Sequence, residues 1–178
     1  LEKSRDSREI RAKYLFVFSA IIFPGADGRD VVSLRLASEK TGKEFAEKVA
    51  NKAKELGVKL SFDMNFRMDI YKDFNEALKA YKPFVESADI IKFSDDELRQ
   101  YTGIDDFDKA IEKIYKKDLL LVITLGSKGS YYKYNSCSGI VETVKVKPLD
   151  TTGAGDAFFG TFLANIEGKE FTEENIKN

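Results

Sequence analysis

Apolar residues occur along this chain in two alternating patterns, which predict strands and helices in turn. Continuous apolar runs rich in β-branched and aromatic residues are typical of buried strands. Tyr14 to Ile22 is such a run, and further strands are predicted over Val58 to Phe62, Asp89 to Phe93 and Leu119 to Thr124. Apolar residues at helical spacing predict helices over Thr41 to Leu56, Phe74 to Val85, Ser94 to Gly103 and Phe107 to Ile114.

Glycine and proline set several of the predicted boundaries. Gly57 supplies a stop for the first helix. Pro83 is compatible with the second helix only if that helix kinks or ends early, because proline lacks a backbone donor. Pro24 to Gly28 has the chemistry of a turn, and Val31 to Leu36 fits either a strand or the lead-in to a helix.

The second half of the chain adds an expected hairpin to this alternation. Ser130 to Tyr134 and Ile140 to Val146 are predicted strands on either side of a loop, Asn135 to Gly139. Strands that alternate with helices, several of them fully apolar, indicate a mainly parallel α/β sheet with helices on both faces. We therefore expect residues 1–178 to form a single α/β domain.

Polar loops follow four of the predicted strands. In open parallel sheets, ligands bind beyond the carboxyl ends of the strands, so loops at those ends share one site. The four loops are Asp63 to Arg67, Ser94 to Glu97, Thr124 to Gly129, and the stretch that begins at Asp150. Their expected convergence predicts a single functional site.

The stretch from Leu149 to Gly160 carries the most specific chemistry. Threonines and glycines here precede an apolar helical pattern, and a helix N-terminus offers unpaired N–H groups and a partial positive charge to an anion. The stretch is neither a Walker A loop nor a G-x-G-x-x-G turn. Asp156 falls in the first helical turn, so a carboxylate lies beside the predicted anion site. Alternatively, Asp156 only complements the helix dipole.

Composition narrows the classes of function. The hydrophobic content of 43% and charged content of 33% are ordinary for a globular domain, and a net charge of -1 argues against nucleic-acid or membrane-surface binding. The single cysteine, Cys137, cannot form an internal disulfide, which favours a cytoplasmic location. Histidine is absent, which excludes Ser-His-Asp and Cys-His catalysis.

Both ends of the sequence resemble interior positions of a longer chain. It begins at Leu1 inside a charged, helical-looking stretch. It stops soon after Thr172, which has the chemistry of a helix N-cap. We therefore expect the sequence to be a segment of a longer protein.

The glycine stretch resembles a known family signature. Asp150-Thr-Thr-Gly-Ala-Gly-Asp156-Ala-Phe158 is similar to the C-terminal motif of the ribokinase-like (PfkB-type) carbohydrate kinases. The resemblance implies that Asp156 takes the proton from the sugar hydroxyl. It also implies that the amides of Gly153, Ala154 and Gly155 form the anion hole for the transferring phosphoryl group. Asp150 and Thr152 would then lie near a monovalent-cation site, and Thr152 near the nucleotide.

Three other loops are similar to motifs of the same family. Asp63-Met64-Asn65-Phe66-Arg67 resembles D-P-N-x-R with methionine in place of proline, which implies that Asn65 faces the nucleotide phosphates or metal and Arg67 the acceptor. Ser94-Asp95-Asp96-Glu97 resembles N-x-x-E, in which the glutamate holds Mg²⁺ through water. The same four residues also fit a capping box, which competes for Glu97.

The third loop lies after the predicted strand that ends at Thr124. Thr124-Leu125-Gly126-Ser127-Lys128-Gly129 resembles the T-x-G-x-x-G turn beside the nucleotide, so Thr124, Gly126 and Gly129 are expected cofactor-binding residues. The alternative for this loop is a plain turn that leads into the hairpin.

Taken together, the resemblance implies most of the nucleotide and phosphoryl-transfer part of a sugar kinase, with the N-terminal sugar-binding and lid part and the C-terminal end absent. It implies ATP and Mg²⁺, with K⁺ as a further candidate, and leaves open a homodimer of the full-length protein. A fructokinase-like activity is favoured by Ile91 to Glu97 and by Val144 to Val146. Ser61 to Arg67 equally resembles 2-keto-3-deoxygluconate kinases. A nucleotide-binding module without turnover is the alternative of another class. The segment alone should be inactive.

Overall fold

The chain folds around a mixed sheet whose strands lie side by side in the same order as in the sequence. The structure is a computed structural model that describes residues 21–23, 31–34, 41–68, 71–147, 149–166 and 168–177. Its strands are β1 (Ile21–Phe23), β2 (Val31–Leu34), β3 (Lys59–Asp63), β4 (Ile90–Ser94), β5 (Leu120–Thr124), β6 (Ser130–Tyr134) and β7 (Cys137–Val141). The central strands β2 to β5 are parallel, while β1, β6 and β7 each run antiparallel to a neighbour.

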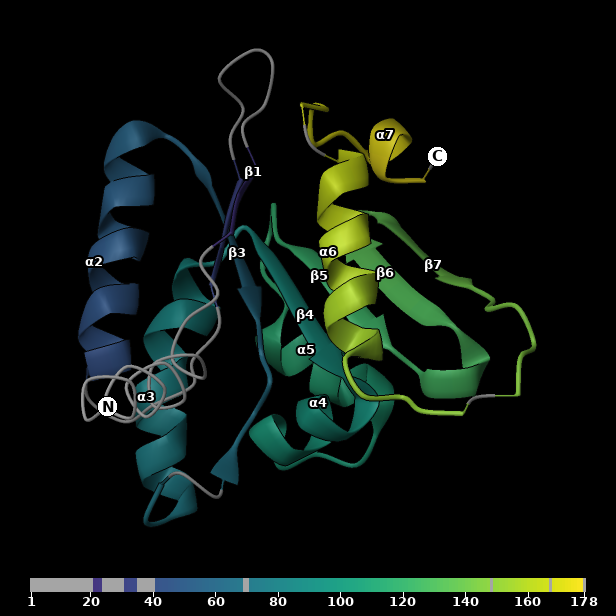
Figure 1. The fold of residues 1–178 in the computed structure, drawn as a ribbon, viewed down its shortest axis with the longest axis horizontal. Coiled ribbons are helices and arrows are strands. Elements are labelled where there is room, and N and C mark those ends of the chain that lie inside the picture. Colours follow the sequence, from purple (N-terminus) through teal and green to yellow (C-terminus); the bar gives the residue numbers. More distant parts are fainter. Residues whose placement is uncertain are drawn as a thin grey trace, which may run out of the picture.

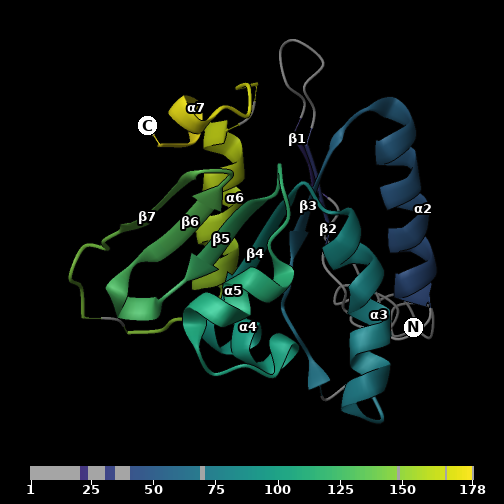
Figure 2. The ribbon, with the colours of Figure 1, turned by 180° about the vertical axis from the view of Figure 1, so that it is seen from behind.

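Helices cover both faces of this sheet (Figures 1 and 2). One face carries α2 (Thr41–Leu56), α3 (Phe74–Ser87), α4 (Asp95–Thr102) and α5 (Phe107–Ile114), and the opposite face carries α6 (Ala154–Ile166). The short α7 (Glu173–Lys177) follows, and η2 (Gly126–Lys128) is a 3-10 turn after β5. The predicted α/β fold is therefore confirmed. Among the described helices, none combines the length and the apolar character that crossing a bilayer would require.

Side chains of the parallel strands point alternately to the two faces of the sheet and pack into two hydrophobic cores. Ile91 and Phe93 of β4 pack on the α3 to α5 face, in a core that also contains Phe62, Phe84, Leu98 and Leu121. Ile90 of β4 packs on the other face with residues of α6, namely Phe159, Leu163 and Ile166. Because β4 is buried on both faces, it lies at the centre of the molecule.

Most predicted boundaries agree with the structure within one or two residues. Gly57 and Gly103 follow α2 and α4 with φ of 68° and 67°, the left-handed conformation that ends a helix. Thr172 caps α7, since its hydroxyl accepts the N–H of Asn175 at 3.2 Å. The ambiguous segment is the strand Val31–Leu34. Of the strand predicted over residues 14–22, only Ile21 and Ile22 lie in the described part.

The second helix does not end early at its proline. α3 continues through Pro83 to Ser87, and the Pro83 carbonyl accepts the Ser87 hydroxyl at 2.7 Å. Phe84 and Val85, just beyond the proline, are buried in the core. Their packing outweighs the backbone hydrogen bond that proline removes.

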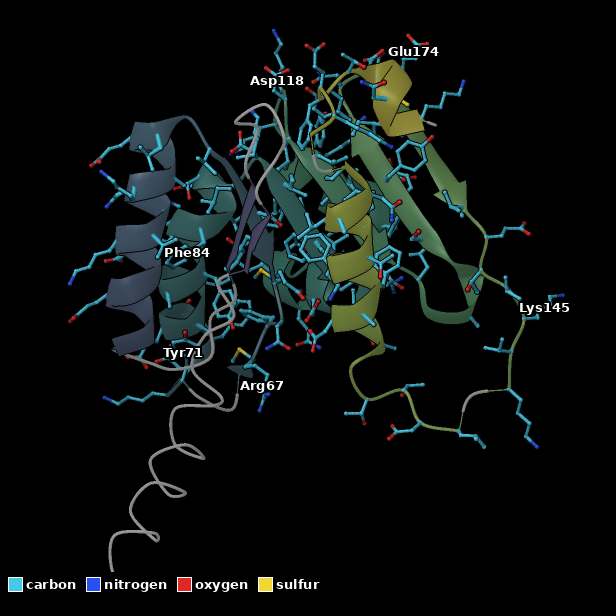
Figure 3. All side chains as sticks on the ribbon, turned by 45° about the horizontal axis from the view of Figure 1, so that its top comes forward. Arg67, Tyr71, Phe84, Asp118, Lys145 and Glu174 are labelled. Carbon is cyan, nitrogen blue, oxygen red and sulfur yellow. The ribbon has the colours of Figure 1, made fainter. Side chains whose placement is uncertain are left out.

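The predicted hairpin loop was wrong. The turn consists of Asn135 and Ser136 only, and β7 already begins at Cys137. Asn135 has φ of 50°, which permits a two-residue turn. Residues 142–146, predicted as strand, are exposed and irregular, and Lys145 points away from the body of the molecule (Figure 3).

Candidate active site

Three parallel strands end at the same edge of the sheet. Asp63 of β3, Ser94 of β4 and Thr124 of β5 are the last residues of their strands, and Ser94 pairs directly with Thr124. Arg67, four residues after Asp63, lies at this edge, whereas Asp118, which precedes β5, lies at the opposite edge (Figure 3). The structure thus places the predicted loops after these strands together.

Tyr81 of α3 holds the loop that follows β3. Its hydroxyl donates to the carbonyl of Asn65 at 3.1 Å and accepts the N–H of Arg67 at 3.3 Å. Asn65 itself adopts φ of 34°, so the loop turns sharply between these two contacts. Burial raises the pKa of Tyr81, which keeps the hydroxyl protonated and able to donate. The sequence analysis did not identify this tyrosine.

Apolar packing fixes the inner side of the same loop. Met64, which takes the place of the family's proline, is fully buried. The Phe66 ring packs edge-on against Tyr81, with centroids 5.0 Å apart, and against Tyr101. Arg67 is exposed. The loop therefore has a buried inner side, while its final arginine is exposed at this edge of the sheet.

Glu97 joins this loop to the start of α4. One carboxylate oxygen accepts the N–H of Ser94 at 2.7 Å, and the Ser94 hydroxyl accepts the N–H of Glu97, which forms the predicted capping box. The other oxygen accepts the N–H of Phe66 at 3.0 Å. Each carboxylate oxygen has a further lone pair for a water molecule. Glu97 is thus compatible with holding Mg²⁺ through water, although its first role is to bind two backbone amides.

The turn after β5 lies next to Ser94 because β4 and β5 are in register. The Thr124 hydroxyl is 3.5 Å from the carbonyl of Phe93. Gly126 and Gly129 have φ of 60° and 100°. A Cβ atom on Gly129 would lie 2.0 Å from the carbonyl oxygen of Val141, so β7 passes too close for any other residue. This glycine serves the hairpin whether or not it also contacts a nucleotide.

The glycine stretch forms a tight turn into α6. The Asp150 carboxylate accepts the N–H of Thr152 at 2.8 Å, and this hydrogen bond lowers the pKa of Asp150. Gly153 has φ of 77° and α6 begins at Ala154. The N–H of Ala154 donates to the carbonyl of Thr151 at 3.1 Å, so a bound phosphoryl group would have to share or replace that acceptor.

Asp156 lies in the first turn of α6, and its residue is exposed. A carboxylate at this position is close to the partial positive charge of the helix N-terminus. Its exposure makes this position accessible from solvent. The same exposure extends over residues 151–154, so an anion can reach the turn from solvent.

A buried ion pair that the sequence analysis did not identify lies beneath this turn. Lys92 of β4 donates to the Asp63 carboxylate at 3.0 Å, and each side chain is 8% exposed. A Cβ atom on Gly155 would lie 3.3 Å from the Lys92 ammonium nitrogen, so the lysine reaches the first turn of α6. The signal in the sequence was a lysine within an otherwise apolar strand.

The described residues offer no ready-made metal cage, since they contain no group of three or more carboxylates, thiols or imidazoles. A Mg²⁺ ion that arrives with a nucleotide does not need one, because it keeps several waters and takes phosphate oxygens together with one or two carboxylates. Glu97 and the exposed Asp150 are carboxylates of this kind at the sheet edge and beside the glycine turn.

Comparison with known proteins gives a consistent result. The sequence model of the pfkB family carbohydrate kinases matches residues 30–175. Fructokinase-2 of Solanum lycopersicum is 44% identical over 117 residues, which are 64% of this chain and 35% of the relative. The fructokinase of Vibrio alginolyticus is 35% identical over 143 residues, 80% of this chain and 46% of the relative.

A solved structure also superposes well on this chain. The fructokinase from Vibrio cholerae O395, in its fructose, ADP and calcium ion bound form, matches with a TM-score of 0.70 and 31% identity. The match covers 81% of this chain and 49% of that chain. This chain therefore spans between about a third and about a half of the length of these relatives.

Proposed function

This chain belongs to the pfkB family of carbohydrate kinases, and we propose that it is the phosphoryl-transfer part of an enzyme that phosphorylates a sugar hydroxyl with ATP. The observation that carries the proposal is the position of Asp156 beside an exposed glycine turn at the N-terminus of α6. A helix N-terminus binds the charged phosphoryl group, and the adjacent carboxylate is available for the proton of the acceptor.

In this proposal, the amides of Gly153, Ala154 and Gly155 stabilise the transferring group, and Asp156 accepts the hydroxyl proton. Phosphoryl transfer has a loose transition state that requires little proton removal until late, so the orientation of Asp156 matters more than its basicity. Arg67 faces the acceptor from the loop after β3.

The remaining loops are assigned to the nucleotide and its ions. Asn65, Thr124, Gly126, Gly129 and Thr152 are the proposed nucleotide contacts. Mg²⁺, when bound with ATP, would neutralise charge on the phosphates, with Glu97 holding it through water. Asp150 is the proposed neighbour of a monovalent cation such as K⁺.

Fructose is the first candidate for the sugar. The fructokinases of Solanum lycopersicum and Vibrio alginolyticus support this choice. The second candidate is 2-keto-3-deoxygluconate, because the exposed Arg67 at the sheet edge could pair with a substrate carboxylate. A nucleotide-binding module without turnover is less favoured, because a carboxylate beside the ligand would only weaken the binding of an anion.

The test is a coupled assay of ADP release by the full-length protein with fructose, ribose, 2-keto-3-deoxygluconate and nucleosides in turn. We expect ADP release to depend on the sugar and to be fastest with fructose. Nucleotide binding without sugar-dependent ADP release would instead support the non-catalytic module.

We propose further that residues 1–178 contain neither the sugar-binding and lid part nor all of the adenine pocket. The isolated segment should therefore consume no ATP in response to sugar, and sugar-stimulated ATP consumption by this segment would refute that assignment. A cytoplasmic location is also proposed, on the basis of the ATP requirement and the single cysteine.

A further inference from the structure

Lys92 carries a charge into the buried centre of the sheet. The other residues of β4 that share its burial are apolar, namely Ile90, Ile91 and Phe93. An unpaired ammonium in such a place would be strongly destabilising, so it requires a partner. Asp63 is that partner, because the two residues are directly opposite in the β3–β4 ladder and their charged atoms are 3.0 Å apart.

The pair lies under the N-terminus of α6. Lys92 shares the strand face of Ile90, which packs against α6, and its ammonium is the group that a Cβ on Gly155 would meet, at 3.3 Å. A cation at a helix N-terminus is unfavourable, because the helix dipole is positive there. Lys92 and the turn amides thus concentrate positive potential at the one place where the proposed reaction holds a negatively charged group.

Stability alone does not account for this arrangement. Apolar residues of similar volume in place of a buried ion pair are often neutral or stabilising. A second Lys–Asp pair at the other end of the same strands gives a comparison: Lys59 and Asp89 are 2.9 Å apart, with side chains 45% and 32% exposed. That pair lies at the amino end of the strands, away from the proposed site.

We propose that Lys92 is a positioning residue for phosphoryl transfer. Its ammonium supports the Gly153–Gly155 turn from the protein interior and adds positive potential behind the amides that receive the phosphoryl group. Asp63 holds the ammonium in place and, as the first residue of the Asp63–Arg67 loop, ties that loop to the same turn. The assignment rests on the kinase function proposed above.

The test compares four variants of the full-length enzyme. Lys92→Met should lower both the melting temperature and kcat, the latter by about tenfold or more. The double variant Lys92→Met/Asp63→Leu removes the unpaired carboxylate, so it should recover the melting temperature without recovering kcat. Asp63→Asn retains the ammonium and an oxygen acceptor, and should therefore keep more activity than Lys92→Met. Lys59→Met should leave kcat unchanged.

Two readouts separate a positioning role from a structural one. The KM for sugar should stay within about threefold of wild type in the double variant, since the effect is on the transferring group. The affinity for ADP with aluminium fluoride, measured by calorimetry without turnover, should fall in parallel with kcat. A double variant with wild-type kcat, or with wild-type affinity for this probe, would overturn the role of Lys92 while leaving the kinase function intact. A wild-type enzyme without sugar-dependent ADP release would refute the function and this role together.

Discussion

The carboxylate of Glu97 accepts the backbone N–H of Phe66 at 3.0 Å, and this bond joins the start of α4 to the loop after β3. The capping box at Ser94 requires the Glu97 carboxylate to accept only one N–H, that of Ser94. The additional bond means that one side chain holds two of the loops assigned to the site. A change at Glu97 should therefore affect both the stability of the fold and the geometry of the site.

Glu97→Gln should lower the free energy of unfolding by about 1–3 kcal/mol, because one of the two amides would face an N–H₂ group instead of an oxygen. Chemical denaturation measures this loss. In the full-length enzyme, the variant should also need more Mg²⁺ for half-maximal turnover. The matched control is Ser94→Ala, which costs about 1 kcal/mol but leaves the carboxylate. Equal Mg²⁺ dependence of the two variants would argue against a metal role for Glu97.

Asp156→Asn tests the proposed base. In the full-length enzyme we expect kcat to fall by about a hundredfold or more, since general-base contributions are typically in that range. Asp108→Asn is the control, because Asp108 is also an acidic residue in the first turn of a helix, α5, and is exposed. The Asp108→Asn variant shows how much stability and activity change when a helix N-terminus away from the site loses a carboxylate. Turnover by Asp156→Asn within about tenfold of wild type would show that the base is another group.

Gly129→Ala and Gly126→Ala form a matched pair in the turn after β5. Both glycines have positive φ, so either substitution costs about 1 kcal/mol or more in backbone strain. Only at Gly129 would the new methyl group collide with a neighbour, the carbonyl of Val141. We expect Gly129→Ala to destabilise the fold by on the order of 3 kcal/mol or more. Similar melting temperatures for the two variants would contradict the close approach of β7.

The burial of Tyr81 should lower the free energy of unfolding at alkaline pH. Its pKa in the folded protein is raised above the ordinary value of 10.0 by burial, so the unfolded chain ionises first as the pH rises. The contribution is fully present below pH 10.0 and is lost above it, by up to about 1.4 kcal/mol per pH unit. Urea unfolding at about pH 9 and about pH 11 should show a smaller loss for Tyr81→Phe than for wild type. An equal loss of stability in wild type and Tyr81→Phe would show that ionisation of the Tyr81 hydroxyl does not cause the loss.

Tyr101 gives a similar contribution in the same pH range. Burial raises its pKa to about 12. The wild-type curve alone therefore cannot be assigned to one residue, and the difference between wild type and Tyr81→Phe is the quantity to compare.

Periodicity and caps were sufficient to predict the helices α2, α4 and α5 and the strands β3, β4 and β5, because these elements bury regular apolar faces. The predictions were less complete where long-range packing decided the outcome. The alternative that the helix over Phe74 to Val85 ends early at Pro83 is wrong, because Phe84 and Val85 beyond the proline are buried and the helix continues to Ser87. The hairpin turns at Asn135 and Ser136 and not over the five residues predicted, because Asn135 adopts a positive φ of 50° that permits a two-residue turn.

In the candidate site too, local sequence patterns predicted some features, whereas long-range contacts determined others. Motifs identified the loops, and three of them follow the strands expected, β3, β4 and β5. The Asp150 stretch does not, because β7 ends at Val141 and residues 142–147 are irregular. Tyr81 lies outside the motifs, and Lys92 falls within the Ile91 to Glu97 segment but was given no role there. These two side chains act across 14 and 63 positions in sequence, from Arg67 to Tyr81 and from Lys92 to Gly155. Such contacts depend on strand register, which periodicity does not determine.

The order of the strands has a consequence for how the protein is made on the ribosome. Because β1 to β7 lie side by side in chain order, each new strand finds its neighbour already synthesised, and the sheet can grow in one direction. Helix α6 breaks this order, since it returns across the sheet to pack on Ile90 of β4 and on Leu120 and Val122 of β5. The glycine turn therefore reaches the other loops only after α6 has been synthesised. A nascent chain that has not yet reached Ile166 would carry the sheet without the complete helix α6 that brings the glycine turn to it.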